Sequence, residues 1–347
     1  MMKKKTIISI LIIIGLITIT LIVLGIIFDK EEFEKQQGRT SIYDVSSNGT
    51  IAYVFFDEGN PGIYLQSDTA SPEEPIVQLK IDQEILDISF SPDGKKLAYI
   101  ISHKNKQEDL KSAIHVVNVE TGSNQVLFAK RTLVTEIEYH PTNEDMLYYL
   151  NADTFENYSP IASAKPHDFD VFSYQISSGE TKQHTDLKKY MMQSLRVSRT
   201  KNTVYVSMFD DTDVETAEDS FATYLRIFEI SLDDPKSIQV VSQKDNEQDI
   251  YDFAVAANDD AFIYQAVNDT GEDGIFQYEL FFYDRQTEQG ERFTHLREHT
   301  TNPIIGPDEK YVYFVVDKQF GSPKPDYYLY QMTIGGGNPE EIPLYMN

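Results

Sequence analysis

The 347-residue chain contains no cysteine and no tryptophan. Without cysteine no disulfide can form, so an exported domain of this sequence would depend on buried apolar surface for its stability. Basic residues are also scarce: 30 Lys and Arg stand against 56 Asp and Glu, which gives a formal net charge of −26. This excess of negative charge argues against nucleic acid or an anionic lipid surface as a partner.

One segment near the N-terminus has no charge at all. Residues 6–28 are 23 almost entirely apolar or Thr and Gly residues, long enough as a helix of about 1.5 Å per residue to cross a hydrocarbon core of roughly 30 Å. Lys3, Lys4 and Lys5 precede it, which predicts a cytoplasmic N-terminus. The alternative, a cleaved signal peptide, would have a shorter apolar run and a small-residue cleavage site. We therefore expect a basic tail (1–5), a transmembrane anchor (6–28), a polar spacer (29–40) and an extracytoplasmic domain (41–347).

The expected extracytoplasmic domain repeats a hairpin pattern six times. In the clearest copy, residues 87–100, alternating apolar residues lead into the turn Ser91-Pro92-Asp93-Gly94 and a second strand follows; Pro presets the turn's negative φ and Gly accepts a positive one. The second strands end at tyrosines 53, 99, 148, 205, 264 and 313, and each is followed by another hairpin. Four strands per repeat of about 50 residues predict an all-β fold, a six-bladed β-propeller with four-stranded blades. The expected blades are 41–79, 83–130, 131–187, 188–243, 244–296 and 297–347; an irregular β-sandwich is the alternative.

The segment Ser91-Pro92-Asp93-Gly94-Lys95-Lys96-Leu97-Ala98-Tyr99 resembles the WD40-like repeat of TolB-type propellers. The resemblance covers about residues 41–347. It is strong in the second repeat and partial in the third and sixth, and in the other three only the hairpin pattern supports it. It implies a six-bladed fold and an origin in the bacterial envelope. It implies no single function, because similar propellers serve as adaptors, sensors, substrate gates and sometimes enzymes. The expected anchor departs from the soluble periplasmic TolB. How the ring closes is open: each terminal blade is one contiguous run, or residues 35–41 add a strand to the sixth blade.

The loops between the second and third strands vary most in length, and in a propeller they gather on one face. The third is expected to run from Asn151 to Asp170 and contains Phe155, Tyr158 and His167; the sixth contains Phe320. Long loops on a rigid scaffold commonly carry binding sites. We therefore predict a ligand site on this looped face, with these four residues as candidates, and place the short Ser-Pro-Asp-Gly-type turns on the opposite face.

A second set of candidates lies five residues before the turn in four of the repeats. These are Asp87, Glu136, Asp252 and Asn302. They are expected near the mouth of the channel, where they would hold a cation or a basic peptide end. The structural alternative is that each accepts backbone N–H groups between blades. Calcium is the only cofactor we consider, for this ring or for the oxygen-rich loop 210–215; the loop lacks the glycine of a calcium-binding loop, so a solvated acidic loop is the preferred interpretation.

Linear signatures of catalysis are missing. The sequence has no G-x-S-x-G elbow, no P-loop and no dinucleotide fingerprint, and His295 and His299 lack the H-E-x-x-H pattern. The sequence thus predicts a membrane-anchored propeller that binds a protein, peptide or envelope ligand without catalysis and without a metal. The alternative is a metal-dependent hydrolase or lyase with its site at the channel. A third hypothesis is a subunit of a membrane complex that associates through its anchor.

Overall fold

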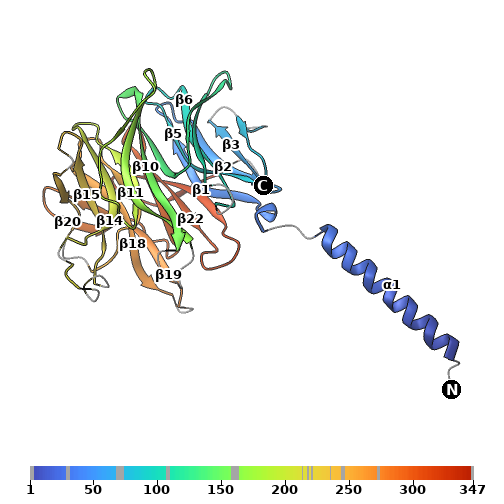
Figure 1. Ribbon diagram of the computed structural model, residues 1–347. Helices are drawn as coiled ribbons and strands as arrows, with labels where there is room; N and C mark the ends of the chain where they lie inside the picture. Colours follow the sequence, from blue (N-terminus) through green and yellow to red (C-terminus); the bar gives the residue numbers. More distant parts are fainter. Residues whose placement is uncertain are drawn as a thin grey trace.

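The computed structural model describes residues 4–28, 32–67, 74–106, 110–157, 164–212, 214–216, 219, 222–234, 236–243, 247–271 and 274–344. It begins with a helix, α1 (Lys4–Phe28), and a short 3-10 turn, η1 (Glu32–Lys35). From Gly38 onward every long element is a β-strand (Figure 1). Among the described residues, no helix combines the length and apolarity needed to cross a membrane. The transmembrane anchor stays a prediction.

The strands follow one another in six antiparallel runs of four within the described chain. The first run consists of β1 (Gly38–Val45), β2 (Ile51–Asp57), β3 (Asn60–Gln66) and β4 (Val77–Gln78). The second consists of β5 (Gln83–Phe90), β6 (Lys96–His103), β7 (Ser112–Asn118) and β8 (Asn124–Lys130). The third consists of β9 (Leu133–His140), β10 (Asn143–Asn157), β11 (Ala164–Gln175) and β12 (Glu180–Gln183).

The later runs keep the same order of strands. The fourth consists of β13 (Met192–Val197), β14 (Thr203–Phe209), β15 (Leu225–Ser231) and β16 (Ile238–Val240). The fifth consists of β17 (Phe253–Val255), β18 (Ala261–Thr270), β19 (Phe276–Asp284) and β20 (Gln289–Arg292). The sixth consists of β21 (His299–Ile305), β22 (Tyr311–Asp317), β23 (Tyr327–Thr333) and β24 (Glu340–Ile342). One parallel pairing, Tyr278 with His299, joins the fifth and sixth runs into an eight-stranded sheet. Each run of four is called a unit below.

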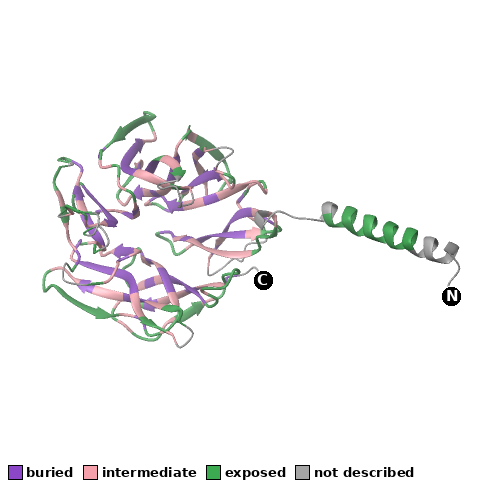
Figure 2. Ribbon diagram, turned by 60° about the horizontal axis from the view of Figure 1, so that its bottom comes forward, coloured by how far each residue is buried: buried purple, intermediate pink, exposed green. Residues whose placement is uncertain are grey.

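The units are arranged about a common centre, so the fold is propeller-like (Figure 2). The first strands lie innermost and neighbour one another in the order β1, β5, β9, β13, β17, β21 and back to β1. The second strands are almost wholly buried, whereas outer strands such as β12 and β20 are exposed along their length. Apolar side chains pack between neighbouring units: Val54 and Ile63 of the first unit share a core cluster with Leu97 of the second. Burial of this apolar surface, at about 25 cal/mol per Å², is the main stabilising contribution in a chain without disulfides.

Each unit places a tyrosine of its second strand opposite one residue of its first strand. The tyrosines are Tyr53, Tyr99, Tyr149, Tyr205, Tyr264 and Tyr313. The sequence alignment chose Tyr148 in the third unit, which is wrong by one residue. The register of β10 slips between Asn143 and Leu147, and this irregularity moves Tyr149, not Tyr148, into the repeated position.

Among the described strands, none is exchanged between the two ends of the ring. β1 pairs with β2 in the first unit and β24 pairs with β23 in the sixth, so each terminal unit is a contiguous run. A shared core cluster that includes Tyr53 and Leu329 packs the two units together. The Gln66 side-chain amide also donates to the Pro343 carbonyl at 2.9 Å. The structure thus answers the question of closure that the sequence left open.

The long loop expected at 151–170 is for the most part a hairpin. β10 and β11 continue their pairing outward through Thr154 with His167 and Phe155 with Pro166. Alternating side chains and complete backbone pairing favour extended strands over an irregular loop of this length. The candidate Tyr158 lies outside the described residues.

Candidate functional site

The inner strands are joined by polar side chains at every junction between units. On one side of the ring, carboxylates accept backbone N–H groups of the following unit. Asp44 Oδ2 accepts the Phe90 N–H at 2.6 Å, and Asp87 Oδ2 accepts the Ile137 N–H at 2.8 Å. Glu136 accepts two such groups, the Ser194 N–H at Oε1 (2.8 Å) and the Leu195 N–H at Oε2 (2.7 Å). Each first strand is at an edge of its unit, so the N–H groups on its outer side have no partner within the unit, and these carboxylates accept them. Ser194 and Leu195 also lie within an irregularity of the strand register.

The remaining junctions use hydroxyl and amide groups. Ser194 Oγ donates to Asp252 Oδ1 (2.8 Å), Thr301 Oγ1 donates to Asp252 Oδ2 (2.6 Å), and Asn302 Nδ2 donates to the Ser41 carbonyl (2.8 Å). Together these bonds form a closed interunit belt. Ser194 and Asn302 have φ values of 57° and 49°, the left-handed region, so the belt holds two non-glycine residues in a costly conformation.

The belt contains all four channel residues singled out from the sequence. Asp87, Glu136 and Asn302 lie on the inner strands, Asp252 directly precedes the inner strand β17, and each is engaged in the belt. Asp87 and Glu136 accept backbone N–H groups of the next unit, as in the structural alternative considered for this set. Asp252 instead accepts the hydroxyls of Ser194 and Thr301, and Asn302 donates to a carbonyl. Burial raises the pKa of Asp87 and of Glu136, while the backbone N–H bonds pull both values down.

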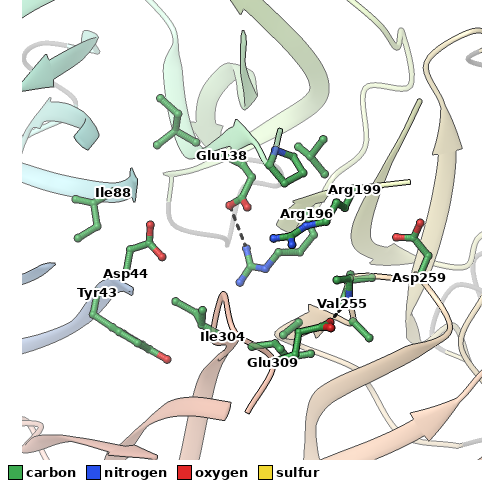
Figure 3. Close-up of a pocket in the computed structure, with 18 of the residues that line it drawn as sticks. Tyr43, Asp44, Ile88, Glu138, Arg196, Arg199, Val255, Asp259, Ile304 and Glu309 are labelled. Atoms are coloured by element: carbon green, nitrogen blue, oxygen red, sulfur yellow. Dashed lines mark hydrogen bonds and ion pairs between the residues drawn. The ribbon is translucent and has the colours of Figure 1, made fainter. Parts of the chain in front are cut away.

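A cavity of about 180 Å³ lies within the ring, beside the belt. All six units contribute to its wall through their first strands and the turns that follow, from Tyr43 and Asp44 in the first unit to Gly306 and Glu309 in the sixth (Figure 3). Because Pro141, Ala257 and Gly306 are turn residues, the cavity is at the face of the short turns. The sequence placed the ligand site on the opposite, looped face.

Arg196 is the central charged residue of the cavity. Its position opposite Tyr205 corresponds to Ile88, Ile137 and Ile304 in other units, so a guanidinium replaces an apolar side chain. Nη1 donates to the Leu195 carbonyl at 2.8 Å and lies 4.0 Å from Glu138 Oε2 (Figure 3). Burial alone disfavours the arginine charge, but the carboxylates around it, Glu138 first, outweigh burial and raise its pKa.

Two carboxylates near Arg196, those of Asp44 and Glu138, differ in their hydrogen bonds. Asp44 belongs to the belt, and burial raises its pKa to about 6 against the opposing effect of two backbone N–H bonds. Glu138 makes no hydrogen bond with another described residue, and burial raises its pKa to about 8 although Arg196 opposes the shift. Its side chain is 31% exposed. Glu138 is therefore an acceptor that remains open toward the cavity.

The turn face adds three charged groups to the rim. Arg199 is exposed, and Glu309 Oε1 accepts the Ala257 N–H at 2.8 Å. Asp259 is only 4% exposed; its Oδ2 accepts bonds from Ser198 Oγ and Thr200 Oγ1, while Oδ1 is buried and meets no donor among the described residues. The cavity thus combines two guanidinium groups with several carboxylates.

The candidates from the looped face do not join this cavity. Phe155 packs against a core cluster, and His167 Nδ1 lies 3.2 Å from Asp168 Oδ1, both within the β10–β11 hairpin. Phe320 belongs to another unit, where its ring stacks on His299 with centroids 4.0 Å apart. No ring contact or polar bond among the described residues links Phe320 with Phe155 or His167.

The described residues contain no group of three or more His, Asp and Glu arranged to hold a metal ion. Loop 210–215, considered for calcium, is only partly described. Within it, Asp211 pairs with Lys189, and Asp210 accepts a bond from Thr212 Oγ1 at 3.0 Å. The calcium interpretation stays untested.

Sequence reasoning missed Arg196, Glu138 and Asp44, although all three lie in segments that define the repeat. Alignment of the first strands position by position would have found Arg196, because the equivalent residues in the other units are apolar or aromatic. Glu138 and Asp44 lack such a signal. Acidic residues are frequent throughout the chain, and only the fold shows which of them face the channel.

Comparison with solved structures supports the propeller fold. TolB from Acinetobacter baumannii superposes with a TM-score of 0.52 at 14% identity, covering 90% of this chain and 64% of TolB. The β-propeller domain of the Trilobed protease from Pyrococcus furiosus is described as having an open velcro topology. It superposes with a TM-score of 0.53 at 13% identity, covering 89% of this chain and 84% of that domain. An oligogalacturonate lyase from Vibrio parahaemolyticus superposes with a TM-score of 0.56 at 9% identity, covering 88% of this chain and 81% of the lyase.

These similarities establish a TolB-like propeller fold. No protein-family model matches the chain. No curated protein matches it either. The solved structures include both TolB proteins and enzymes, so function has to be argued from the site.

Proposed function

We propose that this chain is a six-bladed, TolB-like propeller of the cell envelope that binds a protein or peptide partner without catalysis. The partner enters the channel cavity at the turn face. The observation that carries this proposal is Glu138, which faces Arg196 in the cavity at 4.0 Å yet takes no part in the interunit belt. The belt accounts for the other inner carboxylates as structural groups; Glu138 and the free donors of Arg196 are left to meet a ligand.

The size of the cavity limits what enters it. At about 180 Å³ it is smaller than the roughly 300–1,000 Å³ of pockets that enclose drug-sized ligands, and close to cavities of about 150 Å³ that accept a benzene-sized molecule. A single side chain or a chain end fits; an oligosaccharide does not. The rest of the partner would then lie across the turns of the rim.

We also propose that residues 6–28 anchor the chain in the membrane with the propeller outside. The segment carries no charge, and its described apolar side chains, such as Leu11 at 62% and Leu21 at 63%, are exposed around the helix. The spacer meets the propeller at the looped face, where the Gly59 N–H donates to the Gln36 carbonyl at 2.9 Å. With this attachment the turn face and its cavity point away from the anchor, toward a partner.

The test is site-specific photocrosslinking of the full-length chain in intact cells. A photoreactive residue replaces Arg199 at the rim of the cavity, and a matched one replaces Phe276, which is 52% exposed on the looped side of β19. We expect one discrete crosslinked product from position 199 and none of that mass from position 276. The reverse pattern would place the partner on the looped face and overturn the proposal.

The alternative from the sequence is a metal-dependent hydrolase or lyase with its site at the channel. One observation favours this alternative: a similar structure is described as oligogalacturonate lyase in complex with manganese, and it superposes with a TM-score of 0.52 at 11% identity. That resemblance concerns the fold alone. A stoichiometric transition metal in the purified chain, together with turnover of an acidic oligosaccharide, would favour the enzyme over the binding module.

A further inference from the structure

We propose that the channel cavity receives an organic cation, a primary ammonium group from a lysine side chain or an amino terminus, with Glu138 and Asp44 as its acceptors. This inference rests on the proposed function and gives the chemistry of the group that the partner inserts.

The channel holds more negative than positive groups. The positive groups are the Arg196 guanidinium, whose strongest electrostatic partners are Glu138 and Glu136, and the exposed Arg199 at the rim. The acidic groups are Asp44, Asp87, Glu136, Glu138 and Asp252. Carboxylates removed from water are costly unless a cation or hydrogen-bond donors compensate them. A further cation in the cavity would compensate the excess negative charge, whereas an anion would increase that excess.

The wall of the cavity also contains an oxygen that needs a donor. Asp259 lines the cavity and is more than nine-tenths buried, with φ of 61°. Its Oδ2 is bonded to the hydroxyls of Ser198 and Thr200, but Oδ1 has no donor among the described residues. A buried acceptor left without a partner costs about 1–3 kcal/mol. An entering ammonium brings three N–H donors, which suits an acidic wall with open acceptors.

A metal ion suits the cavity less well than an ammonium group. Calcium takes six to eight oxygen ligands, and most carboxylate oxygens near the channel already accept backbone or hydroxyl hydrogens. In the described part of the chain no three acidic or histidine side chains converge as a metal site. The Arg196 guanidinium inside the cavity would repel a divalent ion twice as strongly as an ammonium.

The experiment measures binding of small probes to the full-length chain in detergent micelles by ligand-observed NMR. The ammonium probes are N-acetyl-lysine methylamide, which stands for a side chain, and alanine methylamide, which stands for an amino terminus. The controls are the norleucine and glutamate derivatives of the same backbone. We expect one of the ammonium probes to bind at least about tenfold more tightly than norleucine, a difference of 1.4 kcal/mol. Which of the two binds more tightly identifies the source of the ammonium.

The variants locate the probe. Glu138→Gln keeps the shape and removes the charge that the carboxylate carries above its pKa of about 8. At pH 9, where the lysine-derived probe is still an ammonium, it should weaken binding of that probe about tenfold. Glu144→Gln makes the same change on an exposed residue of the same unit, outside the cavity wall, and should leave binding unchanged. Asp44→Asn provides a second variant in the cavity, and the unfolding transition of each variant reports whether it folds.

Three results would overturn the inference: tighter binding of the glutamate probe, binding of Ca²⁺ that displaces the ammonium probes, or an equal effect of Glu138→Gln and Glu144→Gln. These failures are separable from failure of the proposed function. If photocrosslinking at position 199 still captures a partner while neither ammonium probe binds, the binding site stands and the ammonium chemistry is wrong. If position 199 captures nothing while an ammonium probe binds, the cavity chemistry stands and the partner-binding role is wrong.

Discussion

The Arg196 guanidinium lies 4.0 Å from the Glu138 carboxylate, and the two residues belong to the inner strands of adjacent units, β13 and β9. Arg196 occupies a position that isoleucine holds in three other units. A repeat that tolerates isoleucine here does not require an arginine for packing. The charge pair is thus an addition to the scaffold, and it sets the electrostatics of the whole channel.

Removal of the arginine charge should destabilise the propeller. Arg196→Ile restores the side chain found in other units but leaves the channel carboxylates without their cation, which costs about 3 kcal/mol or more. Urea unfolding followed by circular dichroism measures the loss. Arg199→Ile removes a similar charge from an exposed site and should change stability by less than about 0.5 kcal/mol.

A double variant tests whether charge imbalance is the cause. Arg196→Ile combined with Glu138→Leu removes both members of the pair, and replacement of a buried pair by apolar groups is often neutral. The double variant should therefore recover part of the stability lost in Arg196→Ile. If the double variant is less stable than the unsubstituted chain by the sum of the losses measured for Arg196→Ile and Glu138→Leu alone, the arginine acts through packing and not through its charge pair.

Stability should fall as the pH rises from about 6.5 to 8.5. Burial raises the pKa of Glu138 to about 8 from an ordinary 4.5, so the folded protein binds this proton more tightly than the unfolded chain does. The stabilisation is complete below about pH 4.5 and is lost as pH rises through about 8. Asp44, with a pKa of about 6, changes in the same direction at lower pH. Allowing for partial exposure, Glu138 contributes about 2 kcal/mol.

Urea midpoints at pH 6.5, 7.5 and 8.5 measure this slope, and Glu138→Gln should flatten it. The window avoids His184, whose pKa is lowered to about 4 by burial and whose stabilisation is lost only below about pH 6.5. The charged groups that act on Glu138 are Arg196, Asp44 and Glu136. An unchanged slope in Glu138→Gln would assign the pH dependence to one of these neighbours.

The interunit belt should be as sensitive to substitution as a core. Glu136 accepts two backbone N–H groups, those of Ser194 and Leu195. Glu136→Ala leaves both without a partner at the inner strands, which should cost about 2–4 kcal/mol. Glu144→Ala, on the exposed turn of the same unit, is the matched control and should be nearly neutral. Equal unfolding free energies for the two variants would show that water replaces the carboxylate in the channel.

The repeat pattern predicted the fold well because each unit carries the same local signals. The Ser91–Gly94 turn has the hydrogen bond expected of it, from the Gly94 N–H to the Ser91 carbonyl at 2.8 Å. Strand periodicity and turn residues are local properties, and a single sequence contains them. The register of the third unit was wrong by one residue because the slip in β10 leaves no mark on the spacing of the tyrosines.

The site was harder to predict because it depends on which inner strands are neighbours in the ring. Asp87 and Glu136 were found by their repeated position, yet their hydrogen bonds reach residues 50 to 59 positions away in the next unit. Whether such a carboxylate binds a ligand or the neighbouring backbone depends on that distant contact. The looped face was favoured on loop length, whereas the cavity is bounded by the short turns on the other side.

Closure of the ring provides a last prediction, at Asn302. Its side-chain amide donates to the Ser41 carbonyl at 2.8 Å, its own carbonyl accepts the Tyr43 hydroxyl at 2.7 Å, and its φ is 49°. Asn302→Gly loses the amide bond but suits the left-handed backbone, and should cost about 1 kcal/mol. Asn302→Ala loses the same bond and adds strain, so it should cost about 1 kcal/mol more. Hydrogen exchange should then show β1 and β21 opening before the other inner strands, because no strand in the described part of the chain is shared by the first and sixth units. Uniform exchange across all six inner strands would mean that the closure is no weaker than the other junctions.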